Sequence, residues 1–431
     1  MTNKEKEKYK IVTISDHPLA PSGVGLQARY VIDHLVKTDN FKVIAIAGAI
    51  KHANYQPQKY VDWGDNVVIV PTNGYGNKDL LRQILDVEKP DAIWFITDPR
   101  FYGWLWEMED EVHQQCPLIY WHVWDNPPYP KYNELHYKCT DFIGCINKLT
   151  YNFLEENGFD NIEYIPHGVP EEDYTILSGE KVSEVRKTHL NENADDYFVV
   201  FYNSRNALRK RTGNVLHAWR EFLDQIPEED RENCLLCMHT PPRDPEGQDL
   251  FKVADMLGIR DFLGFHEKKV ENKIMCEFYN MADATISLSS EEGFGLSILE
   301  SLMCGTPVIC TKTGGMQDQV VDPETNEEFG HCLTPDARSL IGSQTTPYIW
   351  SHHVDPKTGA TAILDLYNKK KELGKDYKNT IAGQKARDSV LRRFHLPTLQ
   401  KKWEEVVTRE IENFKRKKNS LSSRPLRMMT I

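Results

Sequence analysis

The sequence has no long apolar segment and no excess of basic residues. None of its hydrophobic runs approaches the roughly 20 residues that a membrane-spanning helix requires. The charged start, MTNKEKEKYK, leads only into the short apolar run IVTI, which does not fit a secretory signal peptide. With 52 Lys and Arg against 64 Asp and Glu, the formal net charge is −12. This balance disfavours a general nucleic-acid binder, because such proteins neutralise phosphates with basic side chains.

The cysteines also lack the spacing of a disulfide framework or a zinc site. They number nine, an odd count, and are scattered along the chain. Cys234 and Cys237 form a Cys-x-x-Cys pair with no second pair to complete a metal site, so we interpret them as residues of a buried strand. The adjacent His352 and His353 would point to opposite faces of a strand and are interpreted as structural. Together these features predict a soluble protein in a reducing, cytoplasmic compartment.

What the sequence does contain is two series of apolar runs, each alternating with helical patterns. A chain of 431 residues is too long for one hydrophobic core. Runs as uniformly apolar as these are typical of strands in parallel sheets that helices cover on both faces. The first series is KIVTISD, FKVIAIAG, NVVIVPT, DAIWFITD, PLIYWHVW and DFIGCIN; the second is YFVVFYNS, CLLCMHT, DFLGF, DATISLSS and TPVICT.

These two series predict two doubly wound, Rossmann-like α/β domains, residues 1–172 and 173–395, divided in the polar segment EYIPHGVPEEDY. A helix over about residues 396–416 is expected to pack back on the first domain, with Pro397 in its first turn. The basic residues 417–431 are expected to form a flexible tail, with weak contact to an anionic surface as an alternative. Ligands of doubly wound sheets bind beyond the carboxyl ends of the strands, here between the facing domains.

The segment SSEEGFGLSILESLMCGTPVIC carries the most specific chemistry. Glu292 and Glu300 flank a Gly-Phe-Gly turn that follows a predicted strand and begins a helix. The glycines allow backbone to approach a ligand closely, and a helix N-terminus attracts phosphate. Carboxylates accept hydrogen bonds from hydroxyls. The combination indicates a ligand with both phosphate and sugar, such as a nucleotide sugar.

The longer string EGFGLSILESLMCGTPVI resembles the signature of the group 1, or family 4, retaining glycosyltransferases, which have the GT-B fold. The resemblance implies transfer of a sugar from a nucleoside-diphosphate sugar to an acceptor hydroxyl, with retention of anomeric configuration. It implies that Glu300 binds the donor ribose and that Glu292 holds the transferred sugar and stabilises its positive charge. The donor-binding backbone implied by the resemblance is that of Gly293, Phe294, Gly295, Leu296 and Ser297.

The segment YNSRNALRKRTGN supplies the basic pair that this family uses on the donor diphosphate. The resemblance assigns that role to Arg205 and Lys210, five residues apart, where fixed cations would offset the charge of the leaving group. The neighbouring Arg209 and Arg211 could also reach the phosphates, and a solvated basic helix start is the alternative. The sequence has no convincing Asp-x-Asp metal motif, so we expect a reaction without metal or cofactor.

In the first half the resemblance is weaker. Gly23 and Gly25 follow the first predicted strand and would begin a helix that faces the ligand, although the glycine triplet of dehydrogenases is missing. The resemblance implies that His122, at a strand end, orients the transferred sugar; the alternative is a core histidine. Asp125 follows in a loop expected on the acceptor side. His167 stands where the family often has asparagine.

Two other functions compete with glycosyl transfer: a nucleotide-sugar epimerase of GT-B fold and a noncatalytic nucleotide-sugar-binding module. A dehydrogenase is disfavoured, because the dinucleotide fingerprint is absent. The sequence leaves the acceptor open among a glycan, a lipid-linked sugar, a protein, a small molecule and a modified nucleobase. It does not specify the donor base and sugar, the linkage or the oligomeric state.

Overall fold

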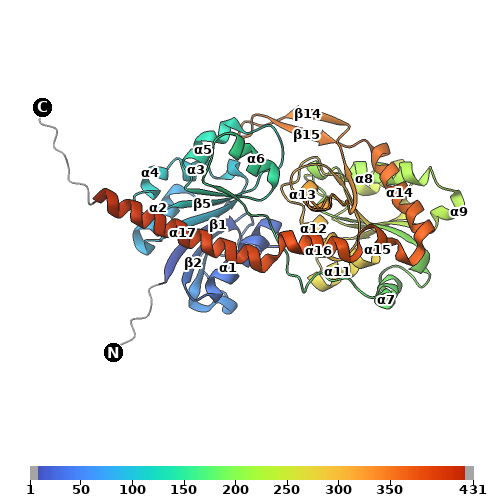
Figure 1. Cartoon of the computed structure of the whole chain (residues 1–431), viewed down its shortest axis with the longest axis horizontal. Helices are drawn as coiled ribbons and strands as arrows, with labels where there is room; N and C mark the ends of the chain where they lie inside the picture. The colour runs from blue at the N-terminus through green and yellow to red at the C-terminus, as the bar shows by residue number, and fades with distance from the viewer. Residues whose placement is uncertain (1–7, 423–431) are drawn as a thin grey trace, which may run out of the picture.

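The computed structural model describes residues 8–422, which form two domains, each built on a parallel sheet (Figure 1). The first sheet has seven strands in the order β3-β2-β1-β4-β5-β6-β7. Its strands are β1 (Tyr9–Asp16), β2 (Phe41–Gly48), β3 (Val67–Pro71), β4 (Ala92–Thr97), β5 (Leu118–His122), β6 (Phe142–Cys145) and β7 (Ile162–Tyr164).

Helices cover both faces of this first sheet. Because successive strand residues point to opposite faces, Ile11 packs in a cluster with α1 and α17, whereas Val12 packs with α2. The helices formed by residues of this half are α1 (Gly23–Lys37), α2 (Lys78–Glu88), α3 (Gly103–Trp106), α4 (Glu109–Val112), α5 (Glu134–Lys138) and α6 (Lys148–Glu156).

The second sheet has six parallel strands in the order β10-β9-β8-β11-β12-β13. One face packs against α8 (Thr212–Leu223), α10 (Leu250–Leu257) and α14 (Pro356–Leu373). The strands are β8 (Phe198–Asn203), β9 (Cys234–His239), β10 (Leu263–His266), β11 (Ala284–Ser287), β12 (Val308–Thr311) and β13 (Gly330–Leu333). The other helices are α7 (Gly179–His189), α9 (Glu228–Arg231), α11 (Asn272–Met281), α12 (Leu296–Met303), α13 (Met316–Val320), α15 (Tyr377–Ile381) and α16 (Gly383–Phe394).

The predicted architecture of two doubly wound α/β domains is therefore confirmed. The apolar runs recognised in the sequence correspond to β1–β6 and β8–β12. β7 and β13 were not predicted, because each has only three or four residues and most of these are partly exposed. Across residues 8–422, no helix has both the length and the apolar sequence needed to cross a membrane.

A hairpin of β14 (Ala337–Ile341) and β15 (Ile349–His353) leaves the second domain and reaches the first (Figure 1). The backbone N–H of Trp350 donates to the carbonyl of Pro127 at 2.8 Å, and the Tyr132 hydroxyl donates to the carbonyl of Tyr348 at 3.3 Å. The sequence analysis did not predict this hairpin, whose first strand is exposed along its whole length.

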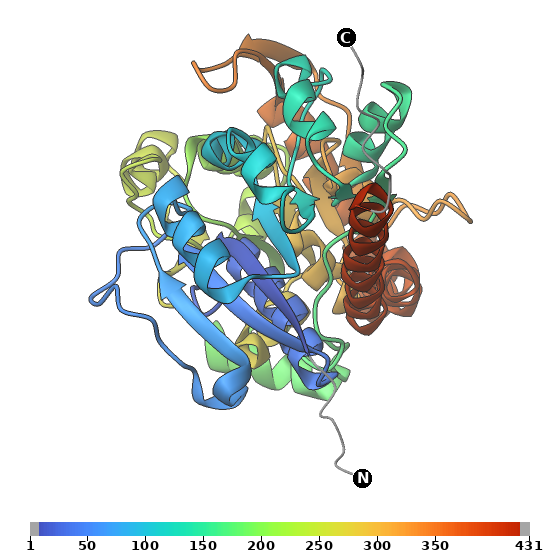
Figure 2. The same cartoon turned by 90° about the vertical axis from the view of Figure 1, so that its left-hand side faces the viewer.

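Helix α17 (Leu396–Ser422) crosses from the second domain and lies along the first, as Figures 1 and 2 show. Its Trp403 is fully buried, with ring centroids 5.6 Å from Trp94 and 5.1 Å from Trp121. The flexible tail expected from residue 417 is wrong for residues 417–422, which continue the helix. Lys and Arg favour helices, and Lys418 Nζ donates to the Gln114 carbonyl at 2.7 Å. Residues 423–431 lie outside the described part of the chain.

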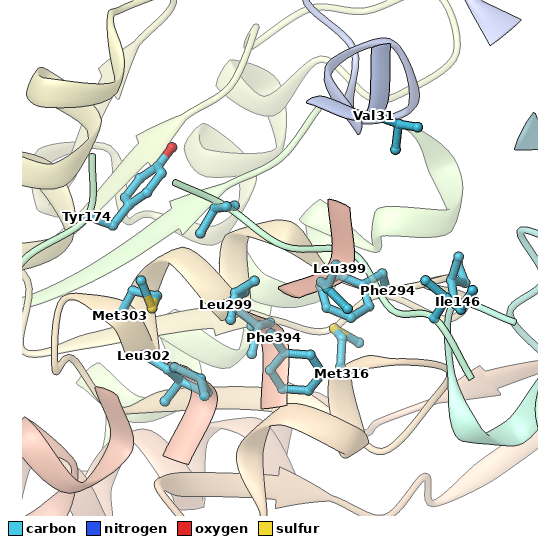
Figure 3. Close-up of a cluster of buried hydrophobic side chains, with 14 of the residues drawn as sticks. Val31, Ile146, Tyr174, Phe294, Leu299, Leu302, Met303, Met316, Phe394 and Leu399 are labelled. Carbon is cyan, nitrogen blue, oxygen red and sulfur yellow. The ribbon is translucent and has the colours of Figure 1, made fainter. Parts of the chain in front are cut away.

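Where the domains meet, they share one apolar cluster. Figure 3 shows Phe294, Leu299 and Met316 of the second domain beside Phe394 and Leu399, close to the start of α17. Val31 and Ile146 of the first domain belong to the same cluster. This shared core holds the carboxyl ends of the two sheets toward each other.

Replacing Trp403 with alanine should destabilise the protein strongly. The indole fills the space between α17 and the first sheet, and removal of a buried aromatic ring typically costs about 3–5 kcal/mol. Urea unfolding followed by tryptophan fluorescence and circular dichroism would measure the loss. Lys401→Ala, on the same helix with a 72% exposed side chain, is the control and should change stability by less than about 0.5 kcal/mol. Equal effects of the two substitutions would contradict the packing of α17.

Candidate active site between the two sheets

The loop between β11 and α12 presents Glu292 to two cations. Lys210 forms an ion pair with Glu292, and Arg209 Nη1 lies 3.6 Å from Glu292 Oε2. The carboxylate is largely buried, with 15% of its side chain exposed. Burial favours the protonated acid, but the charges of Lys210 and Arg209 outweigh it and hold the pKa of Glu292 below its ordinary value. Glu292 is therefore an ionised carboxylate in a desolvated position.

Arg205 lies elsewhere, so the structure does not bring the predicted basic pair together. Its guanidinium makes two hydrogen bonds to Asp244, at 2.8 and 3.0 Å, and pairs with Glu246 at 3.0 Å. Arg209 takes the place beside Lys210. The reason is local: a 3-10 turn over Leu208–Lys210 precedes α8, and residues in such a turn do not follow the spacing of a regular helix.

Glu300 lies in the second turn of α12, within a group of phenols. The Tyr279 hydroxyl donates to Glu300 Oε2 at 2.6 Å, and Asn203 Nδ2 donates to the Tyr279 oxygen at 2.8 Å. Burial raises the pKa of Glu300 to about 7, and hydrogen bonds from Tyr279 and Tyr174 oppose that rise. Sequence reasoning missed these partners, because they come from β8, α11 and the segment before α7, and no local motif joins them.

Two glycines fix the path of this loop. Gly295 has φ of 89°, in the left-handed region that favours glycine. At Gly314, with φ of 44°, an added Cβ would lie 1.8 Å from the carbonyl oxygen of Glu292. The loop after β12 therefore rests directly on the backbone of Glu292. Gly314 was not among the predicted site residues, although the Gly-Gly pair in KTGGMQ was a visible signal.

The other predicted residues of the donor loop have different surroundings. Phe294 points into the shared core, with its ring 5.5 Å from Phe394. Gly293 is pressed against the first domain, where an added Cβ would meet Ile146 and Val123. Leu296 and Ser297 begin α12 and are partly exposed.

The predicted glycine loop of the first domain meets this donor loop. Ser22 caps α1 by accepting from the N–H of Gly25 at 3.0 Å, and an added Cβ on Gly25 would lie 2.6 Å from the His17 carbonyl. At Gly23 an added Cβ would lie 3.1 Å from Leu296 Cδ1. The N-termini of α1 and α12 therefore lie close together; that they face one ligand stays a prediction.

His122 and His167 are both buried. His122 is 1% exposed at the end of β5, and its Nε2 lies 3.1 Å from the hydroxyl of Tyr137. Burial lowers the pKa of His122 to about 3, so the ring is neutral. Burial also lowers the pKa of His167 to about 3, while the charge of Glu292 acts in the opposite direction. The His167 ring lies 5.2 Å from that of Phe294.

Asp125 extends the charged group into the first domain. Burial raises its pKa to about 7, Arg209 acts to lower it, and Asp98, Glu291 and Glu292 add to the rise. This carboxyl therefore lies in the field of Arg209 from the opposite domain. Among residues 8–422, no group of three or more His, Cys, Asp or Glu side chains is arranged to hold a metal ion.

Two buried asparagines connect the loops of the two domains. Asn126 Nδ2 donates to the Ser290 carbonyl at 3.2 Å, and its Oδ1 accepts from Thr313 at 2.6 Å. Asn147 Nδ2 donates to the carbonyls of Gly293 and Trp124 at 2.7 and 2.6 Å. Neither asparagine was predicted, because three of these contacts join residues more than 140 positions apart along the chain and the fourth joins residues 23 apart.

Removing Lys210 and Glu292 together should cost less stability than the sum of the two single removals. Lys210→Met would leave Glu292 buried beside Arg209 alone, and breaking a buried pair typically costs about 3–5 kcal/mol. The double variant Lys210→Met/Glu292→Gln removes both charges, so its loss should be smaller than the sum of the single losses. Urea unfolding of the four proteins gives this coupling. Arg205→Met, at an exposed pair, is the control and should cost at most about 1 kcal/mol; additive losses at Lys210 and Glu292 would refute the pairing.

Glu300 should make stability depend on pH. Its folded pKa of about 7 is above the ordinary value of 4.5, so the folded state binds the proton more tightly. The proton-linked stabilisation is complete below about pH 4.5 and is lost as the pH rises to about 7. Relative to wild type, Glu300→Gln should therefore gain on the order of 2 kcal/mol between pH 5 and pH 8, measured by urea unfolding. A difference that does not change with pH would mean that Glu300 titrates normally.

Comparison with known proteins gives a family for part of the chain. Residues 184–331 match the family described as glycosyl transferases group 1. A D-inositol 3-phosphate glycosyltransferase of Acidothermus cellulolyticus is 32% identical over 168 residues, which cover 38% of this chain and 36% of that protein. A protein of the same name from Thermomonospora curvata is 42% identical over 81 residues, or 19% and 18% of the two chains. The alignments thus span little more than a third of these relatives at most.

Solved structures resemble the whole chain in fold. Anabaena HepE in complex with UDP and glucose has a TM-score of 0.65 at 14% identity, covering 93% of this chain and 99% of its own. Sucrose-phosphate synthase of Thermosynechococcus elongatus has a TM-score of 0.69 at 16% identity, with the same coverage. Residues 184–331 therefore match the group 1 glycosyl transferases, within a chain that has the GT-B fold.

Proposed function

We propose that this protein transfers a sugar from a nucleoside-diphosphate sugar to an acceptor hydroxyl, with retention of anomeric configuration and without a metal or cofactor. The observation that carries the proposal is the buried group at the start of α12. There, Glu292, in the loop before the helix, meets Lys210 and Arg209, and Glu300 lies in the second turn of the helix. Few ligands other than a nucleotide sugar use carboxylates, cations and a helix N-terminus at one place.

In this proposal, donor binding rearranges the ion pair. The diphosphate would compete for Lys210 and Arg209, because phosphate oxygens form strong charge-assisted hydrogen bonds. Glu292 would then be released to accept hydrogen bonds from the transferred sugar and to stabilise its developing positive charge. Glu300 would accept from the ribose hydroxyls. Arg205 is held by Asp244 and would have to leave it to reach the diphosphate.

In the chemical step, the acceptor hydroxyl would attack the anomeric carbon from the same face that the diphosphate leaves. The bond from the anomeric carbon to the phosphate oxygen breaks, and a bond to the acceptor oxygen forms on the same face. The acceptor proton passes to a phosphate oxygen of the leaving nucleoside diphosphate, so this chain supplies no nucleophile. Closure of the domains would exclude water, which would otherwise hydrolyse the donor. The role of His122 in orienting the sugar stays a prediction, since its hydrogen bond is to Tyr137.

The nine cysteines are all unpaired thiols, which supports a reducing, cytoplasmic location for this activity. The inositol-phosphate acceptor in the names of the curated relatives is not carried over to this chain. An epimerase or a noncatalytic module would also bind the donor, but its nucleotide release would not depend on an acceptor.

The first test is thermal unfolding with UDP, GDP and ADP in EDTA. UDP leads the series because HepE was crystallised with it. At about 100 times its dissociation constant, a ligand that binds only the folded state stabilises it by about 2.7 kcal/mol. We expect one base to raise the melting temperature, and we expect Glu300→Ala and Lys210→Met to lose that rise. Arg220→Ala, at an exposed pair with Asp224 on α8, should keep it.

If no nucleoside diphosphate raises the melting temperature, with or without Mg²⁺, the proposed function is wrong. A rise that appears only with Mg²⁺ would refute metal independence alone. Retention would be tested separately, by the anomeric configuration of the product in a nuclear magnetic resonance spectrum.

A further inference from the structure

The wall opposite Arg209 is built from two carboxylates of the first domain. Asp98 follows β4 and Asp125 follows β5, and these strands are neighbours in register, with Thr97 opposite His122. Burial raises the pKa of both carboxyls, and the charge of Arg209 opposes that rise in each, so both lie within its field. Neighbouring parallel strands place their carboxyl ends side by side, so the two carboxylates come from one edge of the first sheet.

The second domain adds Glu291 and Glu292 to the same group. Glu291 is 5% exposed, and its Oε2 accepts from Ser290 Oγ at 2.7 Å. Its Oε1 is buried and has no hydrogen-bond partner among the residues that the structure describes. A buried carboxylate oxygen without a partner is costly, so this atom points to a donor that a ligand would supply.

The cations of this group already have partners. Arg209 and Lys210 pair with Glu292 and would be taken by the donor diphosphate under the proposed function. Arg100 lies 3.5 Å from Asp98 and stacks over the ring of Phe101. Arg211 is directed to the hairpin, where it donates to Ser351 Oγ at 3.1 Å. Once a diphosphate occupies Arg209 and Lys210, the carboxylates of this group outnumber the cations that remain beside them.

Aromatic rings complete the wall. Tyr132, in the loop after β5, is a neighbour of Asp98 and Asp125, whose charges add to the effect of burial in raising its pKa. Its ring lies edge-on to Tyr348 of the hairpin, with centroids 5.0 Å apart. Carboxylates accept hydrogen bonds from sugar hydroxyls, and aromatic rings pack against the apolar faces of sugars.

We propose that the acceptor is an uncharged, polyhydroxylated molecule, held through its hydroxyls by Asp98, Asp125 and Glu291, and that this site rejects acceptors bearing a phosphate. The inference rests on the proposed function, since it assumes that a diphosphate occupies Arg209 and Lys210. The physical reason is like-charge repulsion: above about pH 7, where Asp125 is ionised, a phosphate would enter a wall of carboxylates whose remaining cation, Arg100, already pairs with Asp98. Hydroxyls, in contrast, would supply the donor that Glu291 Oε1 lacks.

The first experiment uses inorganic phosphate as the probe. Protein saturated with the nucleoside diphosphate that stabilises it is melted with phosphate or with chloride at equal ionic strength. We expect phosphate to add no further rise in melting temperature over chloride. A phosphate-specific rise in the nucleotide-bound protein would overturn the proposal. If no nucleoside diphosphate stabilises the protein in the first place, the proposed function fails instead, and the two failures are thereby distinguished.

The second experiment compares matched acceptors in nucleotide release from the donor sugar. Glucose is paired with glucose 6-phosphate, fructose with fructose 6-phosphate, and myo-inositol with its phosphate. In each pair of which at least one acceptor is used, nucleotide release should be at least 10-fold faster with the uncharged acceptor than with the phosphorylated one. A phosphorylated member that is used as well as its partner, or better, would overturn the inference.

Substitutions test which carboxylate causes the preference for uncharged acceptors. Asp98→Asn removes one charge at nearly constant shape, so it should raise KM for the uncharged acceptor and reduce the preference over the phosphorylated partner about 10-fold. Asp365→Asn, on α14 beside Lys369 and far from this wall, is the control and should change neither value. A preference that Asp98→Asn leaves unchanged would refute the role of this carboxylate, even if the variant loses overall activity.

Discussion

The structure depends on the close contact of loops from both domains around the backbone of Glu292. On one side Gly314 lies so near that a side chain there would overlap the Glu292 carbonyl. On the other, Asn147 of the first domain donates to the carbonyl of Gly293. Held from both sides, the start of α12 cannot shift without disturbing both sheets. Arg209 is tied to the same loop, because its carbonyl accepts from the Ser290 N–H at 2.8 Å and its Nη1 donates to the Glu291 carbonyl at 2.9 Å.

The two glutamates of this short motif have different surroundings, which shift their pKa values in opposite directions. Glu292 faces two cations, which keep it ionised although it is largely buried. Glu300, in helix α12 after this loop, faces phenols instead, and burial raises its pKa to about 7. Neighbouring groups, more than sequence position, therefore set what each carboxylate can do. Glu292 suits a place where positive charge develops during a reaction, and Glu300 suits hydrogen bonding to hydroxyls.

The sequence predicted most reliably what local geometry determines. Apolar runs specified the strands of two doubly wound domains, because a buried parallel strand needs little more than uniform hydrophobicity. Glu292 could be assigned to a loop and Glu300 to the helix after it, since the Gly-Phe-Gly turn between them marks where the helix begins. Arg205 and Arg209 could not be told apart, because an irregular turn lies between them. The position of His167 near Glu292 depends on how the domains pack, and no spacing in the sequence encodes that contact.

The family match covers the residues that we assign to the donor and leaves out the first domain, to which we assign most of the acceptor site. The matched segment, 184–331, includes Lys210, Glu292 and Glu300, the groups that we assign to the donor. It excludes Asp98 and Asp125, which come from the first domain, and it ends before the hairpin that carries Tyr348. Donor chemistry is shared wherever a nucleotide sugar is used, so the residues that serve it can remain alike among proteins with different acceptors. Of the proposed acceptor wall, only Glu291 lies inside the matched segment; the family match therefore says nothing of Asp98, Asp125 or Tyr348, and their role has to be argued from this chain.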